Sequence, residues 1–206
     1  MRLLLVRHGA TSNNQENRFT GQTDVDLSSL GHCQAKAVGE RLAVEPLGVI
    51  VASDLQRTRA TAQMIAHYHT LSVQEDANLR EMALGEWEGL AYTEVVTRDA
   101  TRLHRWQTDS ANYAPPGGEK ATQVRDRVVQ TLAYWQEQQP GGTIVWVTHG
   151  GVIDVLLCHL LGMDLNRRHQ FHLENASITE LDLNQKYAVL IRLNETTHLR
   201  EITGTF

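Results

Sequence analysis

The sequence predicts an α/β fold in which helices cover both faces of a mostly parallel central sheet. Segments with the composition of buried strands alternate with segments of helical periodicity along most of the chain. This alternation is typical of a three-layer α/β/α sandwich. The chain has 206 residues, of which 41% are hydrophobic and 21% charged, as expected for one globular domain. We therefore expect a single domain over residues 1–206.

The first half of the chain predicts two strands and two helices. The segments 2–7 and 49–52 are short and dominated by Leu, Val and Ile, as in buried strands. The segments 29–43 and 54–69 repeat apolar residues at helical spacing. The expected inward-facing residues are Leu30, Cys33, Ala37 and Leu42 in the first helix and Ala60, Met64, Ile65 and Tyr68 in the second.

The second half of the chain predicts two more helices and three more strands. Residues 119–138 have the clearest helical pattern in the sequence, and Glu119 suits the positive end of that helix. The remaining expected elements are a strand at 143–147, a helix at 151–161 and two strands at 177–183 and 187–193 that flank a turn at Asn184-Gln185.

The segment 84–115 does not follow this alternation of strands and helices. It runs into Pro115-Pro116-Gly117-Gly118, a turn sequence of the kind found inside domains. We therefore expect the segment to be an insertion within the single domain, forming a small helical cap.

Composition excludes several classes of partner. The 19 lysines and arginines are outnumbered by 24 aspartates and glutamates, a net charge of −5, so no nucleic-acid-binding surface is expected. No apolar run reaches the about 18 residues that a membrane helix needs, and the run before Arg7 is too short for a signal peptide. The two cysteines, Cys33 and Cys158, favour reduced thiols in the cytoplasm over a disulfide framework.

Histidine followed by glycine occurs at the end of two expected strands. Arg7-His8-Gly9 ends the first strand, and His149-Gly150 follows the strand at 143–147, directly before a helix. In open α/β sheets, ligands bind beyond the carboxyl ends of the strands, and a helix N-terminus there favours an anion. A lone histidine is more often a packed or surface residue, but two at matching positions predict one anion-binding crevice.

Other patterns for phosphoryl transfer or metal binding are absent from the sequence or incomplete. There is no Gly-x-x-x-x-Gly-Lys loop, and neither cysteine has an arginine six residues later. His67 and His69 are spaced as a metal pair, but no closed set of ligands accompanies them. We therefore expect neither a metal site nor a cofactor.

Several motifs follow one another along nearly the whole chain. They are Arg7-His8-Gly9-Ala10-Thr11, Arg18-Phe19-Thr20-Gly21-Gln22-Thr23-Asp24, Ser53-Asp54-Leu55-Gln56-Arg57, Leu79-Arg80-Glu81, Gly85-Glu86-Trp87-Glu88-Gly89, Pro116-Gly117-Gly118-Glu119 and Val147-Thr148-His149-Gly150-Gly151. In this order they resemble the histidine phosphatase superfamily, in the branch with cofactor-dependent phosphoglycerate mutases and many small phosphatases. The resemblance implies a phosphoglycerate mutase-like fold.

The resemblance also implies a role for each of five residues. His8 would attack phosphorus and form a phosphohistidine. Arg7 and Arg57 would grip the phosphate through paired N–H donors. His149 would donate to the equatorial oxygens as charge shifts in the transition state, and Glu81 would protonate the leaving alkoxide and then activate water.

A further set of residues would surround the substrate by the same resemblance. These residues are Asn14, Thr20, Gly21, Gln22 and the backbone N–H of Gly150. Gln22 stays equally open as a residue that stabilises its own loop. Glu86 and Glu88 stay open as alternatives to Glu81 for the acid role.

The implied function is hydrolysis of small phosphate monoesters from phosphorylated metabolites, without a metal. The segments Glu174–Ser177 and Leu193–Leu199 look similar to those of metal-independent phosphoserine phosphatases. The stretch Leu84–Gly89 is shared with α-ribazole phosphatases and with members of broad specificity. Phosphoserine, α-ribazole 5′-phosphate and a range of sugar or organic phosphates are therefore candidate substrates. Phosphoglycerate mutase activity, a non-catalytic module that binds phosphorylated ligands, and assembly as a homodimer all stay open.

Overall fold

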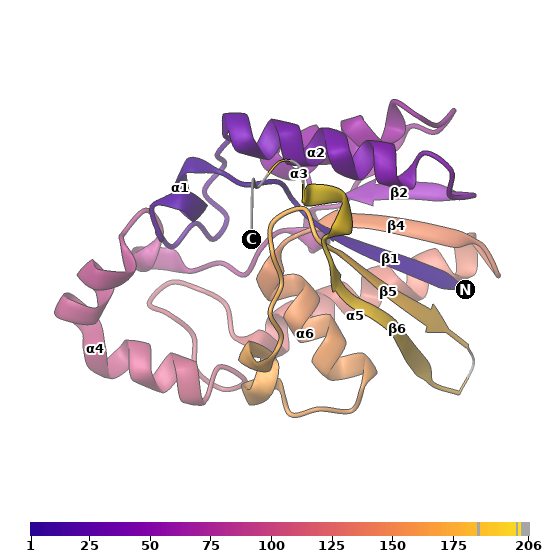
Figure 1. Ribbon diagram of the computed structural model, residues 1–206. Coiled ribbons are helices and arrows are strands. Elements are labelled where there is room, and N and C mark those ends of the chain that lie inside the picture. The colour runs from indigo at the N-terminus through magenta and orange to yellow at the C-terminus, as the bar shows by residue number, and fades with distance from the viewer. Residues whose placement is uncertain (185, 201, 203–206) are drawn as a thin grey trace.

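The structure is a computed structural model that describes residues 1–184, 186–200 and 202. In these residues one six-stranded sheet runs through the molecule in the order β3-β2-β4-β1-β5-β6 (Figure 1). Among the described strands β5 alone is reversed, so the sheet is mostly parallel. The strands are β1 Arg2–Arg7, β2 Val49–Ala52, β3 Val73–Glu75, β4 Thr143–Thr148, β5 Ile178–Leu183 and β6 Ala188–Glu195.

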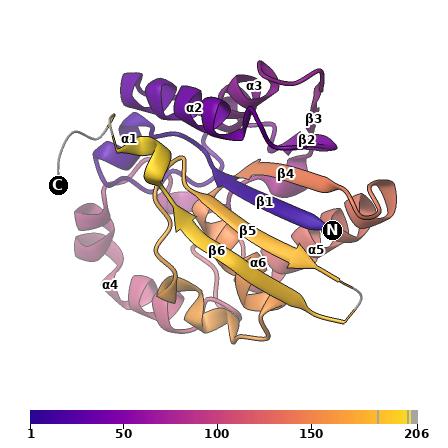
Figure 2. The same ribbon diagram turned by 45° about the vertical axis from the view of Figure 1, so that its right-hand side comes forward.

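Helices cover both faces of this sheet, with α2 and α3 on one face and α5 and α6 on the other (Figure 1, Figure 2). The helices are α1 Ser12–Gln15, α2 Ser29–Leu42, α3 Gln56–Ala66, α4 Tyr92–Thr108, α5 Ala121–Gln138 and α6 Gly150–Leu160. Short 3-10 helices are η1 Ala77–Leu79, η2 Gly85–Trp87, η3 Leu165–Gln170 and η4 Thr197–Leu199. The expected three-layer α/β sandwich is therefore confirmed. None of the described helices has the length and apolar character required to cross a membrane.

The central strand β1 is buried on both faces because its side chains alternate between two apolar cores. Leu3 and Leu5 pack in the core that α5 and α6 cover, whereas Leu4 and Val6 pack beneath α2 and α3. Alternation of this kind follows from the two-residue period of a strand. The strand thus anchors Arg7, its last residue, at the carboxyl edge of the sheet.

The start of α2 is packed closely against the loop that follows β1. The hydroxyl of Ser28 accepts the N–H of Gly31 at 3.2 Å and lies 3.1 Å from the carbonyl oxygen of Ala10, to which it donates. A Cβ at Gly31 would overlap the carbonyl oxygen of Ala10, so only glycine permits this approach. The contact fixes the backbone that directly follows His8.

Most expected elements are confirmed with ends shifted by a few residues, but three differences are informative. The helix expected from residue 119 begins at Ala121, because the Glu119 carboxylate instead accepts the N–H of Ala83 and pairs with Arg127 at 3.0 Å. The short elements α1 and β3 were not expected. Of the turn expected at Asn184-Gln185, residue Gln185 lies outside the described residues.

The expected inward faces of α2 and α3 are correct only in part. Ala37, Leu42 and Ile65 are buried, but Cys33, Met64 and Tyr68 are exposed. At Gly39 of α2 a Cβ would overlap the carbonyl oxygen of Met64. The two helices therefore meet through their backbones there, which leaves the Met64 side chain outside. Tyr68 lies beyond the end of α3 at Ala66, where helical spacing no longer applies.

The segment 84–115, expected as a cap, contains η2 and α4, and α4 stands away from the sheet beside α1 (Figure 1). Within the segment, Trp87 packs edge to face on Trp106 with ring centroids 5.7 Å apart. Phe19, outside the segment, attaches it to the rest of the domain, with its ring centroid 5.8 Å from that of Trp87. The indole N–H of Trp87 donates to Asp99 at 3.0 Å, at a kink in α4.

Candidate active site

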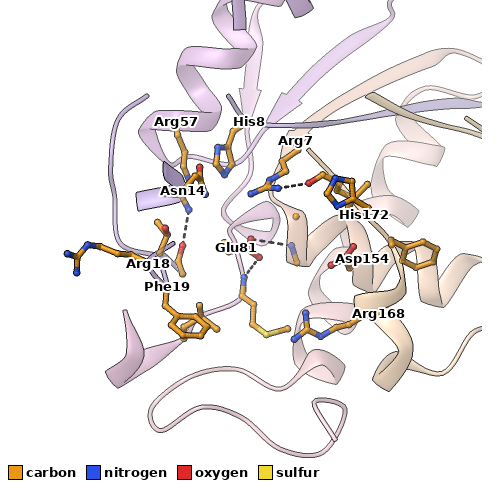
Figure 3. Close-up of a pocket in the computed structure, with 18 of the residues that line it drawn as sticks. Arg7, His8, Asn14, Arg18, Phe19, Arg57, Glu81, Asp154, Arg168 and His172 are labelled. Atoms are coloured by element: carbon orange, nitrogen blue, oxygen red, sulfur yellow. Dashed lines mark hydrogen bonds between the residues drawn. The ribbon is translucent and has the colours of Figure 1, made fainter. Parts of the chain in front are cut away.

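A cavity of about 440 Å³ opens at the carboxyl ends of β1 and β4 (Figure 3). Its polar lining consists of Arg7, His8, Asn14, Arg18, Thr20, Arg57, Glu81, Asp154, Arg168 and His172. Its apolar lining consists of Phe19, Met82, Leu84, Trp106, Phe171 and Leu173, and Gly21, Gly150 and Gly151 complete it. Every residue that the sequence assigned to the site lines this cavity except His149 and Gln22. In the described part of the chain, no cluster of three or more His, Cys, Asp or Glu side chains could hold a metal ion.

His8 is a buried ring with one nitrogen already occupied. Its Nδ1 lies 2.7 Å from the carbonyl oxygen of Gly9. Because a carbonyl only accepts hydrogen bonds, Nδ1 must carry the proton and Nε2 must keep its lone pair. Burial, together with the positive charges of Arg57 and Arg7, holds the pKa of His8 well below its usual value. The imidazole is therefore neutral near pH 7.

Two buried guanidinium groups lie beside His8. Arg7, at the end of β1, donates to the carbonyl oxygen of Leu173 at 2.5 Å, and its Nε has no partner within the described residues. Arg57, in the first turn of α3, is 1% exposed. Burial lowers the pKa of both guanidinium groups, an effect that the negative charge of Glu81 opposes. Two positive charges withdrawn from water attract an anion much more strongly than exposed charges would.

His149 lies behind this group instead of on the cavity wall. Its side chain is fully buried, with the ring centroid 5.1 Å from that of His8. Its Nδ1 accepts a hydrogen bond from Nε of Arg57 at 3.3 Å, so the proton sits on Nε2, which lies 3.0 Å from the hydroxyl of Ser53. Burial, with Arg57 and His8 alongside, holds the pKa of His149 well below its usual value. Both ring nitrogens therefore have protein partners, whereas the sequence led us to expect a contact with the substrate.

Glu81 faces the cavity from the segment after η1 (Figure 3). Its Oε1 accepts the N–H of Met82 at 2.8 Å, and its Oε2 accepts the N–H of Gly151, in the first turn of α6, at 3.2 Å. Of the two alternatives for the acid role, Glu86 is exposed and Glu88 is turned toward a neighbouring loop, and neither lines the cavity. The geometry therefore favours Glu81 as the group that exchanges protons with a ligand.

The carboxylate of Glu88 organises the loop 20–23. Its Oε1 accepts the N–H of Gln22 at 3.0 Å, while Oε2 accepts the N–H of Thr23 at 2.8 Å and its hydroxyl at 2.7 Å. Burial acts to raise the pKa of Glu88, but these hydrogen bonds outweigh burial and lower it. Gly21 adopts φ of 52°, and a Cβ there would overlap the Glu88 carboxylate, so the loop requires glycine.

The residues expected around the substrate divide into two groups. Gln22 lies off the cavity, and its amide donates to the carbonyl oxygen of Glu81 at 3.0 Å, so it stabilises the loop. The hydroxyl of Thr20 lines the cavity and has no hydrogen-bond partner among the described residues. Asn14 accepts the N–H of Thr11 at 3.0 Å through its amide oxygen, which leaves the amide N–H groups as donors.

Asp154 of α6 and Arg168 of η3 also line the cavity, although the sequence analysis did not single them out (Figure 3). One signal could have found Asp154, because it is an acidic residue among Val, Ile and Leu in a helix that starts at Gly150. Such a carboxylate falls on the inner face, one turn from the start of the helix. Arg168 stands between Arg167 and His169, where the sequence resembles an ordinary exposed segment.

Comparisons with known proteins agree with this fold. The family model of the histidine phosphatase superfamily (branch 1) matches residues 3–196. The chain is 33% identical over 201 residues to phosphoserine phosphatase 1 of Hydrogenobacter thermophilus, covering 98% of this chain and 95% of that protein. It is 30% identical over 194 residues to the adenosylcobalamin/alpha-ribazole phosphatase of Escherichia coli, covering 94% of this chain and 96% of that protein.

Solved structures give the same result. A mycobacterial glucosyl-3-phosphoglycerate phosphatase in complex with VO3 superimposes with a TM-score of 0.88 at 34% sequence identity. The match covers 95% of this chain and 99% of that one. The expected resemblance is therefore confirmed over nearly the full length of the chain.

Proposed function

The chain belongs to the histidine phosphatase superfamily, and from this premise we propose that it hydrolyses small phosphate monoesters through a phosphohistidine formed on His8. The observation that carries the proposal is the hydrogen bond of 2.7 Å between His8 Nδ1 and the carbonyl oxygen of Gly9. It leaves Nε2 of a neutral imidazole available as a nucleophile. The cavity around it is lined by Arg7 and Arg57, which suits a doubly charged phosphate.

In the first step, Nε2 of His8 attacks phosphorus in line, and the bond from phosphorus to the ester oxygen breaks. Arg7 and Arg57 bind the non-bridging oxygens and neutralise their charge throughout this step. The N-terminus of α6, whose first residue Gly150 lines the cavity, adds partial positive charge from its backbone N–H groups. Glu81 gives its proton to the departing alkoxide.

In the second step, water attacks the phosphohistidine and the bond between nitrogen and phosphorus breaks. Glu81, now a carboxylate, accepts the proton of the attacking water. The N–H groups of Met82 and Gly151 keep its two oxygens at the cavity. Inorganic phosphate leaves, and neutral His8 is regenerated with its proton on Nδ1.

We propose that His149 first orients the guanidinium of Arg57. In the free protein, Nδ1 of His149 accepts a hydrogen bond from Arg57 while Ser53 holds the opposite nitrogen. His149 thereby fixes the plane of the guanidinium that meets the phosphate. When a dianion binds, it can draw the Nε–H of Arg57 away from Nδ1 of His149. Its negative charge then favours protonation of His149, and the freed Nδ1–H can donate to a phosphate oxygen as the reaction proceeds.

Candidate substrates come from the names of relatives. Three such relatives are named as phosphatases of phosphoserine, alpha-ribazole and glucosyl-3-phosphoglycerate, and we propose the same range of small phosphorylated metabolites for this chain. A probable phosphoglycerate mutase of Citrobacter koseri is 32% identical over 185 residues. Incubation with 3-phosphoglycerate separates the two activities. A phosphatase releases inorganic phosphate, whereas a mutase forms 2-phosphoglycerate.

We also propose a cytoplasmic location and a homodimeric assembly. Cys33 and Cys158 are both free thiols, which suits a reducing compartment.

The proposed dimer would form at strand β6, on the outer edge of the sheet. Val189, Ile191 and Leu193 of β6 are each at least 39% exposed, and a second copy of the chain would cover them. Light scattering over a dilution series would test the dimer, and a constant monomer mass would rule it out.

The proposed function is tested with His8→Ala and p-nitrophenyl phosphate in the presence of EDTA. Wild-type protein should turn the ester over in the chelator, because Arg7 and Arg57 supply the positive charge that a metal would provide. His8→Ala should lose turnover, and acid-labile phosphate should be trapped only on the wild type. His32→Ala, at an exposed position of α2, is the matched control. Magnesium-dependent turnover, or an active His8→Ala, would contradict the mechanism.

A further inference from the structure

Arg168 is a buried cation at the opposite end of the cavity wall from His8 (Figure 3). Its side chain is 3% exposed, its Nε donates to the hydroxyl of Ser110 at 3.1 Å, and its guanidinium stacks 4.8 Å above the ring of Trp106. Its Nη2 is buried and has no hydrogen-bond partner among the described residues. A buried cation without a paired anion costs several kcal/mol of folding free energy, so this arrangement needs an explanation.

Asp154 lies on the same part of the wall but does not neutralise Arg168. Among the described residues the two side chains interact through their charges but form no ion pair, and Oδ1 of Asp154 is itself buried without a partner there. Burial raises the pKa of Asp154 to about 8, against the opposing effect of Arg168. The carboxyl group is therefore mostly protonated at neutral pH, and a protonated carboxyl can donate a hydrogen bond.

These two groups together form a polar site with one net positive charge. Arg168 lies away from His8 and Arg57 (Figure 3), although Asp154 is close enough to Arg7 for their charges to interact. The wall of the same cavity also carries Met82 and Leu84, which suit the carbon skeleton of a substrate. A neutral hydroxyl would accept hydrogen bonds here but would leave the positive charge of Arg168 uncompensated. A carboxylate would accept the same hydrogen bonds and would also neutralise that charge.

We propose that Arg168 and Asp154 form a second binding site for a carboxylate on the alcohol part of the substrate, so that the preferred substrates are phosphate esters of hydroxy acids. This inference rests on the proposed phosphatase function. Arg168 pairs with the carboxylate, and the protonated Asp154 donates to its second oxygen. Trp106 and Ser110 hold the guanidinium in place beneath the ligand.

Two pairs of substrates that differ at the carboxylate test this inference. Phosphoserine is compared with O-phosphoethanolamine, and 3-phosphoglycerate with glycerol 3-phosphate. A charge-assisted hydrogen bond to a carboxylate corresponds to about 10- to 100-fold in affinity. Wild-type kcat/KM should therefore favour the carboxylated member of each pair by at least about tenfold, mainly through KM.

Variants in η3 and at Asp154 of α6 test which residues cause the preference for carboxylated substrates. Arg168→Gln should remove the preference, by lowering kcat/KM for the carboxylated member of each pair at least about tenfold more than for its uncarboxylated partner. Arg168→Lys keeps the charge and should retain part of the preference, and it also guards against loss of folding in Arg168→Gln. Arg167→Gln changes an exposed neighbour that does not line the cavity and should behave as wild type. Asp154→Asn keeps a neutral donor and should retain the preference, whereas Asp154→Ala should weaken it.

The outcomes separate this inference from the proposed function. If p-nitrophenyl phosphate is turned over in a His8-dependent way but wild-type protein treats both members of each pair alike, the carboxylate site is wrong and the phosphatase stands. Equal losses on all esters in both Arg168 variants would likewise reduce Arg168 to a structural residue. If no ester is turned over, the proposed function fails and this inference fails with it.

Discussion

At the scale of single residues, the proposed mechanism divides the chemistry between His8 as nucleophile and Glu81 as proton carrier. His8 keeps its proton on Nδ1 through Gly9, while Glu81 receives N–H groups from Met82 and Gly151. Each side chain is held by backbone groups of rigid elements, so neither needs to reorganise when substrate binds. The consequence is that variants at the two positions should fail at different steps.

Glu81→Gln should separate these steps. The amide keeps the shape of the side chain but cannot transfer a proton, and general acid–base catalysis contributes about 100- to 10,000-fold. Phosphorylation of His8 should slow strongly with an alkyl phosphate but little with p-nitrophenyl phosphate, whose leaving group needs no proton. Rapid mixing should show a burst of p-nitrophenol followed by phosphoenzyme that is labile to acid and stable to base. Equal losses on both esters without a burst would move the acid to Glu86 or Glu88.

Asp154 predicts a dependence of stability on pH. Its pKa is about 8 in the folded protein and about 4 in an unfolded chain, so between these values the folded state binds the extra proton. The free energy of unfolding therefore decreases as pH rises from about 4 to about 8. Above that range Asp154 causes no further decrease. Asp154→Asn should raise Tm relative to wild type, with no difference near pH 4 and the largest difference above pH 8. A Tm difference independent of pH would refute the assignment.

At the scale of elements, the loop 20–23 depends on η2 and the residue that follows it. Glu88 binds the backbone of Gln22 and Thr23, and Arg57 donates to the carbonyl oxygens of Gly21 and Thr23 at 2.8 and 2.9 Å. The loop thus connects the start of the expected cap to Arg57, which we propose binds the phosphate. A substitution of Glu88 should therefore displace Arg57 through the loop 20–23, although Glu88 does not itself line the cavity.

Glu88→Gln should lower both stability and activity. Its amide NH₂ would face backbone donors, and losing hydrogen bonds to a charged group costs about 2 kcal/mol, or roughly 5 °C in Tm for a chain of this length. Displacement of Arg57 should raise KM for any phosphate ester. Glu86→Gln, at an exposed neighbouring position, is the control. Unchanged melting and kinetics in Glu88→Gln would show that the loop holds its shape without the carboxylate.

Helices and strands were predictable from sequence where burial imposes a clear apolar pattern on them. β1 and β4 are continuous apolar runs buried on both faces, and such runs admit few other interpretations. β3 was missed because Val73-Gln74-Glu75 is a three-residue edge strand with mostly exposed side chains, so burial imposes no pattern on it. The wrong inward assignment of Met64 arose because a glycine contact between α2 and α3 replaces side-chain packing.

At the scale of the whole molecule, local motifs predicted the residues at the proposed phosphate end of the cavity but not those at its other end. Arg7 and His8 were predictable because a strand end and a following glycine are features of the local sequence. Asp154 and Arg168 meet only after α6 and η3 pack together, and no local pattern carries that information. The hydrogen bond between Arg57 and His149 was not predictable for the same reason, because it depends on how the sheet places α3 and the end of β4.

The three guanidinium groups buried around one cavity also make folding respond to the ligand. Burial lowers the pKa of Arg7, Arg57 and Arg168 alike, so the empty protein carries unfavourable charge that a bound anion relieves. Phosphate or vanadate at 100 times its Kd should add about 2.7 kcal/mol of stability, or roughly 5–10 °C in Tm. Sodium chloride at equal ionic strength should not raise Tm. An equal rise in Tm with chloride would mean that salt only screens the repulsion between the buried charges. Product concentration would then set the fraction of molecules that unfold, and with it their lifetime against proteolysis.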